Sequence, residues 1–102
     1  LSILGATGSI GVQTLDVVIA RPEEFQLGWL TVNTRFDLLE EQLQRLKKHG
    51  FTPSGVALAD EKAYQEFRRI TSFQGTILCG DEGVCEAAAD SATDILLSAL
   101  VG

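Results

Sequence analysis

The sequence is short of cysteine, histidine and basic residues, and each shortage argues against a class of protein. Its 102 residues include one histidine and two cysteines, Cys79 and Cys85. So few cysteines suit a reducing compartment, where disulfides are rare, and no cluster of other ligands accompanies the two thiols to form a metal site. The 8 basic residues are outnumbered by 14 acidic ones, which gives a net charge of -6. This acidity argues against sequence-independent binding of nucleic acid.

Long hydrophobic runs are also missing. No apolar stretch approaches the roughly 20 residues that a membrane-spanning helix needs, and no basic segment followed by an apolar one marks a secretory leader. We therefore expect a cytoplasmic protein without a membrane partner. A starting methionine is absent as well, since the chain opens with Leu1 inside a predicted strand, which suggests trimmed ends.

What the sequence does contain is a regular alternation of apolar runs and helical patterns within a length that suits one domain. This alternation predicts a three-layer α/β domain of Rossmann type, with right-handed crossovers and a five-stranded parallel sheet of order 3-2-1-4-5. The predicted strands are 1–4, 25–32, 56–59, 76–79 and 95–101, and the predicted helices are 10–20, 36–48, one capped by Asp60 and one capped by Asp81 that ends near Ala89.

Segment 36–48 gives the clearest helical pattern. Its apolar residues recur at spacings of three and four, which places them on one buried face. Thr34, followed three residues later by Asp37, resembles a capping box at the helix start. Two lysines in the last turn and then Gly50 are typical of a helix end. The helix after Asp60 is expected to bury Ala63, Tyr64, Phe67 and Ile70.

The most informative segment is the run Gly-Ala-Thr-Gly-Ser-Ile-Gly at 5–11, between the first predicted strand and helix. Glycines there suit a tight turn and let a pyrophosphate approach the main chain. The amides of Gly8, Ser9 and Ile10 would face the ligand, and the hydroxyls of Thr7 and Ser9 could add donors. In this context the spacing favours a dinucleotide, the alternative being a turn that needs glycines for geometry alone. A P-loop is disfavoured because no Gly-Lys-[Ser/Thr] is present.

The segment after the second predicted strand indicates which dinucleotide is preferred. Enzymes selective for NAD usually carry an acid there, which binds the ribose 2′-hydroxyl. This chain has Asn33, Thr34 and Arg35, with no carboxylate before Asp37. Arginine pairs bidentately with phosphate, so we expect a preference for NADPH. The alternative is an ordinary surface arginine, although a lone cation is mildly unfavourable at a helix start.

The residues around the glycine run resemble a known family. Residues 3–11, continued by Thr-Leu-Asp-Val-Val at 14–18, closely resemble the opening of the 1-deoxy-D-xylulose 5-phosphate reductoisomerase family, which reads I-L-G-[SA]-T-G-S-I-G-x-x-T-L-D-V-[VI]. The resemblance continues more weakly at 22–25. It returns at 99–102, where Ala-Leu-Val-Gly is similar to the family's A-x-V-G after the fifth strand.

The resemblance implies an NADPH-dependent oxidoreductase of non-mevalonate isoprenoid biosynthesis. Its members isomerise and reduce 1-deoxy-D-xylulose 5-phosphate to 2-C-methyl-D-erythritol 4-phosphate, use a divalent metal (Mg or Mn), and are commonly homodimers. Their catalytic and metal-binding residues lie further along, so the resemblance implies none in this chain, which alone would be inactive. Many members have Gly-Lys-Asn or similar at the ribose-binding segment. The residues that the resemblance assigns to the cofactor are Thr7, Gly8, Ser9, Ile10, Asn33, Thr34 and Arg35.

Two other functions are compatible with the loop. A semialdehyde-type dehydrogenase also opens with a G-A-T-G loop on a Rossmann domain, and its nucleophilic cysteine would lie downstream. A regulatory module could instead sense a dinucleotide without turnover. The stretch 9–18 favours the reductoisomerase. Within that stretch we expect Asp16, in mid-helix, to have a packing or surface role.

Overall fold

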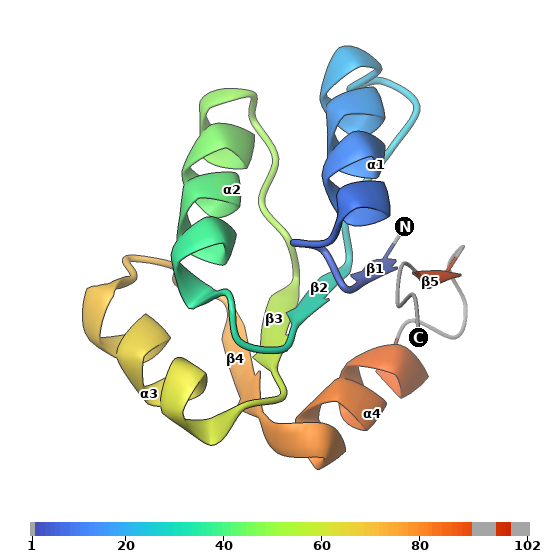
Figure 1. Cartoon of the computed structure of the whole chain (residues 1–102). Coiled ribbons are helices and arrows are strands. Elements are labelled where there is room, and N and C mark those ends of the chain that lie inside the picture. Colours follow the sequence, from blue (N-terminus) through green and yellow to red (C-terminus); the bar gives the residue numbers. More distant parts are fainter. Residues whose placement is uncertain (1, 91–95, 99–102) are drawn as a thin grey trace.

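The computed structural model describes residues 2–90 and 96–98, and it has the predicted alternation of strands and helices (Figure 1). All strand pairs in the sheet are parallel, so the α/β class is confirmed. Residues 1, 91–95 and 99–102 lie outside the described residues. They include both expected ends of the fifth strand and the A-x-V-G match. The elements are β1 (Ser2–Leu4), α1 (Ser9–Ala20), β2 (Trp29–Val32), α2 (Phe36–Lys48), β3 (Gly55–Leu58), α3 (Glu61–Ile70), β4 (Thr76–Cys79), α4 (Gly80–Asp90) and β5 (Leu96–Ser98).

The strand order differs from the predicted 3-2-1-4-5, because the sheet runs β4-β3-β2-β1-β5. β4 lies outside β3, and α3 packs beside α2. In a right-handed crossover, the face of the sheet on which the connecting helix packs depends on the direction in which the chain moves to the next strand. The apolar pattern of a strand is the same whether the chain steps outward from β3 or back to β1, so this pattern could not discriminate the two orders.

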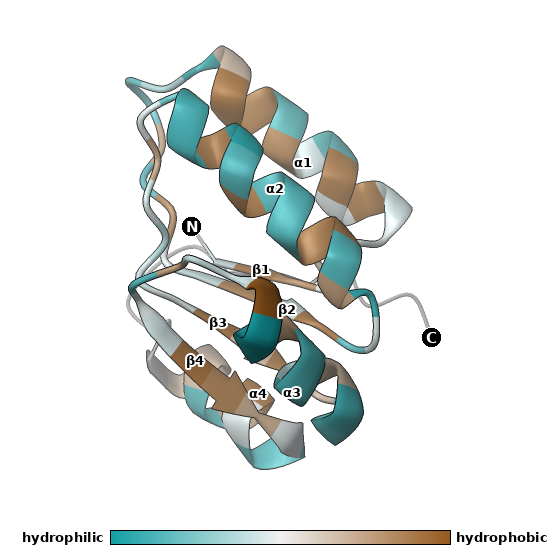
Figure 2. Ribbon diagram, turned by 90° about the vertical axis from the view of Figure 1, so that its left-hand side faces the viewer, coloured by the Kyte–Doolittle hydropathy of each residue, from teal (hydrophilic) through white to brown (hydrophobic). Residues whose placement is uncertain are grey.

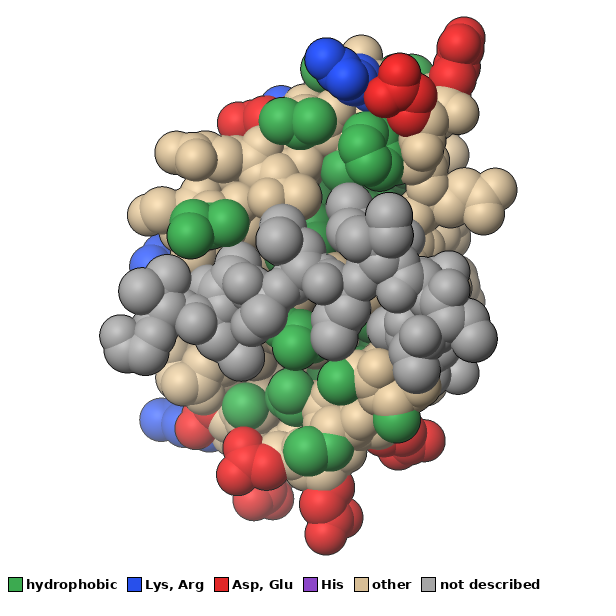
Figure 3. Space-filling model, turned by 90° about the vertical axis from the view of Figure 1, so that its right-hand side faces the viewer, with side chains coloured by type: hydrophobic (Ala, Val, Ile, Leu, Met, Phe, Trp, Pro, Cys, Tyr) green, Lys and Arg blue, Asp and Glu red, His purple; other side chains and the backbone are tan. Residues whose placement is uncertain are grey.

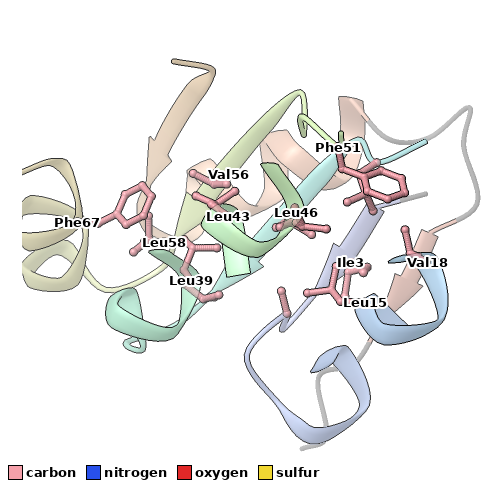
Figure 4. Close-up of a cluster of buried hydrophobic side chains, with 14 of the residues drawn as sticks. Ile3, Leu15, Val18, Leu39, Leu43, Leu46, Phe51, Val56, Leu58 and Phe67 are labelled. Atoms are coloured by element: carbon pink, nitrogen blue, oxygen red, sulfur yellow. The ribbon is translucent and has the colours of Figure 1, made fainter. Parts of the chain in front are cut away.

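The two faces of the sheet are covered by different helices (Figure 2). The steps from β1 to β4 run in one direction and place α1, α2 and α3 on one face, whereas the return step to β5 places α4 on the other. Side chains alternate accordingly along β2: Leu30 and Val32 join the core beneath α1, α2 and α3, and Trp29 joins Ala57 and Ala87 of the α4 side. Figure 4 shows the larger of these two cores.

Two local predictions about helix starts need correction. Arg35, not Thr34, is the N-cap residue of α2, and no side chain caps that helix, so the predicted capping box is wrong. The Thr34 carbonyl instead accepts a hydrogen bond from the Phe36 amide at 2.9 Å. Asp81 lies in the first turn of α4 because that helix begins at Gly80. Asp60 does cap α3, where its carboxylate accepts a hydrogen bond from the Ala63 amide at 2.9 Å.

Burial along α3 is narrower than predicted. Ala63 and Phe67 are buried, Tyr64 is half-buried, and Ile70 is 45% exposed because it ends the helix beyond the core. Large apolar side chains are also exposed on α1, at Ile10 and Val17. Figure 3 shows apolar side chains over α1 above the grey segment and over α4 below it. In the described ranges, no helix is long and apolar enough to cross a membrane.

Candidate functional site

The predicted site residues gather at the carboxyl end of the sheet. The glycine loop follows β1, residues 33–35 follow β2, and Asp60 follows β3, so all three segments lie at the same edge. β1 lies between β2, to which the chain first steps, and β5, to which it finally returns. Ligands of open α/β sheets bind in the crevice at such a switch point. The fold therefore places the glycine loop where a ligand is expected (Figure 1).

The glycine loop is held against β2 by backbone hydrogen bonds. The amides of Gly5 and Ala6 both donate to the Thr31 carbonyl, at 2.9 and 2.8 Å. Gly5 has a φ of 78°, in the left-handed region that side chains disfavour. The Gly8 amide donates to the Gly5 carbonyl at 3.1 Å. The turn thus already uses the Gly8 amide, which sequence reasoning had expected to be open to a ligand.

The last glycine of the motif, Gly11, permits a close approach of α1 to the loop. A Cβ atom at this position would lie 2.5 Å from the Gly5 carbonyl oxygen and 2.7 Å from that of Ala6. Both contacts are with backbone, which cannot move aside as a flexible side chain can. Gly11 therefore sets the distance between the first turn of α1 and the loop.

The start of α1 has the features of an anion site. Within residues 2–90, the amides of Ser9, Ile10 and Gly11 have no backbone acceptor, as expected for the first turn of a helix. Gly8 is the N-cap residue and offers no capping side chain, and the first turn contains no acidic residue. The positive end of the helix dipole is therefore not neutralised by a carboxylate of that turn. Ser9 and Ile10 are exposed, and Thr7 is half-buried.

Arg35 lies at the same edge with most of its side chain in solvent. Its side chain is 57% exposed, and Nε lies 3.5 Å from Oδ1 of Asp37, itself 63% exposed. In the described part of the chain, Asp37 is the carboxylate that pairs with Arg35. The Leu38 amide and, less strongly, the Arg35 charge hold the pKa of Asp37 below its usual value. An exposed ion pair of this kind is weak, so an incoming phosphate can compete for the guanidinium.

Asn33 and Thr34 contribute their backbone to the local structure and expose their side chains. The Asn33 carbonyl accepts from the Asp60 amide at 3.2 Å, which ties the end of β2 to the end of β3. Both side chains are exposed beside Arg35. The structure therefore brings residues 33–35 together at one edge of the sheet with the loop after β1.

Two polar contacts link α2 to the loop and to α1. Asp16 forms an ion pair with Arg45 at 2.6 Å, with both side chains about half-exposed, which agrees with the surface role expected for Asp16. Gln42 donates from Nε2 to the Ala6 carbonyl at 2.8 Å. Sequence reasoning missed Gln42 because a glutamine that follows two glutamates in a helix resembles ordinary helix surface.

Among residues 2–90 and 96–98, no three His, Cys, Asp or Glu side chains lie close enough together to hold a metal ion. A hollow lined by Leu43, Phe51 and Phe73 lies between α2 and the segments that precede β3 and β4, at the opposite edge of the sheet. The candidate site is thus the open carboxyl edge.

Comparisons with known proteins agree over the whole chain. The family model for 1-deoxy-D-xylulose 5-phosphate reductoisomerase matches residues 1–102. The chain is 42% identical over 103 residues to the reductoisomerase of Geotalea uraniireducens and 40% identical over 102 residues to that of a Geobacillus species. These matches cover 100% of this chain and 25% and 26% of those proteins. The chain thus spans about a quarter of their length.

Solved structures of similar proteins share this fold. One is a reductoisomerase in complex with NADPH, fosmidomycin and magnesium, which is 34% identical, with a TM-score of 0.82 over 99% of this chain and 24% of that one. Another is the Zymomonas mobilis enzyme in complex with NADPH, which is 27% identical, with a TM-score of 0.71 over 85% of this chain and 22% of that one. This chain belongs to the 1-deoxy-D-xylulose 5-phosphate reductoisomerase family.

Proposed function

We propose that residues 1–102 form the NADPH-binding domain of a 1-deoxy-D-xylulose 5-phosphate reductoisomerase. The observation that carries this proposal is the open first turn of α1, which faces the switch point of the sheet in a chain of this family. Solved structures of similar proteins hold NADPH. The family match over residues 1–102 favours this function over a semialdehyde-type dehydrogenase or a dinucleotide sensor.

The pyrophosphate of NADPH would bind at the start of α1. The amides of Ser9 and Ile10 would donate to its oxygens, and the helix dipole would favour its charge. The hydroxyls of Thr7 and Ser9 supply further donors, while Gly8 keeps side-chain atoms away from the phosphates. No carboxylate of the first turn repels the ligand. The residues present therefore fit a pyrophosphate.

The adenosine ribose and its 2′-phosphate would bind at residues 33–35. Arg35 supplies the charge, and the exposed side chains of Asn33 and Thr34 supply neutral hydrogen-bonding groups. The absence of an acid at these three positions removes the usual partner of the NAD ribose. We propose that this segment selects NADPH over NADH.

In the longer protein, NADPH would supply a hydride for the reduction that yields 2-C-methyl-D-erythritol 4-phosphate. We propose that the divalent metal (Mg or Mn) and the catalytic residues belong to the part that this chain lacks, and that the full-length protein is a cytoplasmic homodimer. This chain would then bind and orient the cofactor only. Purified alone and supplied with metal, NADPH and substrate, it should show no turnover, and appreciable turnover would contradict this assignment of roles.

The cofactor preference gives a test at Arg35. In the full-length protein, Arg35→Ala should weaken NADPH binding about 10-fold and leave NADH binding nearly unchanged, because one charge-assisted contact is lost. The exposure of Arg35 keeps the effect at the lower end of the range for such contacts. Raised salt should reduce the wild-type preference. Paired titrations of wild type and variant with the two cofactors measure this.

Arg69→Ala is the matched control for this test. Arg69 is an exposed arginine in the last turn of α3 and pairs with Glu66, so its loss should leave both affinities unchanged. If Arg35→Ala weakened NADPH and NADH equally, Arg35 would support the loop and not the phosphate, and Asn33 or Thr34 would become the better candidate. A wild type without any preference would overturn the NADPH assignment.

A further inference from the structure

Gln42 lies on the side of α2 that faces α1, where it lines a small hollow with Val12 and Leu15. Its Nε2 atom donates to the Ala6 carbonyl at 2.8 Å. Because a carbonyl can only accept, the nitrogen of the amide has to face Ala6, which fixes the orientation of the group. Within the described residues, the Oε1 atom of Gln42 is buried without a hydrogen-bond partner. The bond to Ala6 is therefore the hydrogen bond that orients this side chain.

The peptide groups of Ala6 lie where β2, α1 and α2 meet. Ala6 is fully buried, and its amide donates to the Thr31 carbonyl at 2.8 Å. Its carbonyl oxygen lies so close to Gly11 that no Cβ would fit between them. The N–H of Ala6 is thus held by β2 and its C=O by Gln42. Without that donor, a buried carbonyl would lack a partner, which is costly, and the peptide that leads into Thr7 could rotate.

We infer that Gln42 is a positioning residue for the glycine loop. By donating to the Ala6 carbonyl, it orients the amides at the start of α1 without touching the cofactor. The inference rests on the proposed function of that loop. It assigns to α2 a second role beside covering the sheet. Loss of the hydrogen bond from Gln42 to the Ala6 carbonyl should therefore lower the affinity for the cofactor as well as the stability of the fold.

The first test replaces Gln42 by leucine in the full-length protein, which removes the donor and keeps the size. NADPH titration should show about 5-fold weaker binding, the usual effect of one neutral hydrogen bond. Turnover at saturating NADPH should stay unchanged, so the effect appears in KM and not in kcat. Arg45→Leu is the control, because it breaks the 2.6 Å pair with Asp16 one turn further along α2 without reaching the loop. Its NADPH affinity should equal that of wild type.

A second variant, Gln42→Glu, gives a readout that a purely structural role would not move. When protonated, the introduced carboxyl group can donate to the Ala6 carbonyl, whereas in its ionised form it can only repel that oxygen. NADPH affinity relative to wild type should therefore fall as pH rises through the titration of the introduced group. This series also keeps the inference testable if the leucine variant does not fold.

Three outcomes would overturn the role of Gln42. They are a leucine variant that is less stable but binds NADPH like wild type, a glutamate variant whose affinity follows wild type at every pH, and an Arg45→Leu variant weakened as much as Gln42→Leu. A wild type that fails to bind NADPH in the same titrations is a different result. It would overturn the proposed function, and this inference with it.

Discussion

Replacing Gly11 by alanine is expected to weaken NADPH binding at least about 10-fold and to lower the free energy of unfolding by about 2 kcal/mol. The added Cβ would lie 2.5 and 2.7 Å from two backbone carbonyl oxygens, so α1 and the loop have to move apart. Overpacking of this kind costs roughly 1–3 kcal/mol, and displacements near 1 Å can cost about 100-fold in a positioned site. NADPH titration and urea unfolding of the full-length protein measure the two effects.

Gly50→Ala is the control for Gly11→Ala, because it should lower stability without changing the cofactor site. Gly50 follows α2 with a φ of 83°, and nothing lies within 4 Å of the position that its Cβ would take. Alanine there should cost about 1 kcal/mol through backbone strain and leave NADPH binding unchanged. If Gly11→Ala bound NADPH as tightly as wild type, the close approach of α1 to the loop would have no role in binding.

Replacing Phe67 by alanine is expected to give the largest loss of stability, about 3–5 kcal/mol. Phe67 is fully buried and inserts from α3 toward Leu58 and Leu39 (Figure 4). Truncation removes apolar contact and leaves a cavity that the sheet and α2 cannot close. Domains are commonly stable by only about 5–15 kcal/mol, so unfolding should begin at much lower urea concentration. Denaturant unfolding monitored by the fluorescence of Trp29 measures the change.

Ile70→Ala is the comparison for Phe67→Ala, because the two residues lie on the same helix and were both expected to be buried. Ile70 is 45% exposed, so its truncation should cost less than about 1 kcal/mol. Equal losses at the two positions would mean that the end of α3 is packed against the core, contrary to the described structure. A small loss of stability at Phe67 would mean that this side chain does not fill the core between α3, the sheet and α2.

The sequence predicted those features of the fold that local patterns determine. The apolar stripe of α2 gave its bounds, Phe36–Lys48, and the buried Leu39, Leu43 and Leu46. The glycine run predicted a turn between β1 and α1, because a tight strand-to-helix connection needs that composition. The expectation of NADPH came from residues 33–35, and the resemblance in residues 3–18 added the reductoisomerase family, which the glycine spacing alone could not give.

Features that depend on tertiary contacts were not predictable in the same way. The position of β4 depends on whether the chain steps outward from β3 or back to β1, and the apolar pattern of the strand does not discriminate these steps. The exposure of Ile70 depends on where the core ends beneath α3. Gln42 acts through a carbonyl 36 positions earlier in the chain, and no local pattern marks such a partner. In each case the helix or strand itself was predicted, and only its contacts with the rest of the fold were not.

We expect NADPH to bind across the carboxyl edge of this sheet, from the start of α1 to residues 33–35. A crystal structure of the full-length protein with NADPH tests it most directly. We expect pyrophosphate oxygens about 3 Å from the amides of Ser9 and Ile10, and the 2′-phosphate against the Arg35 guanidinium. NADPH bound away from the first turn of α1, or with its 2′-phosphate remote from residues 33–35, would contradict this binding mode.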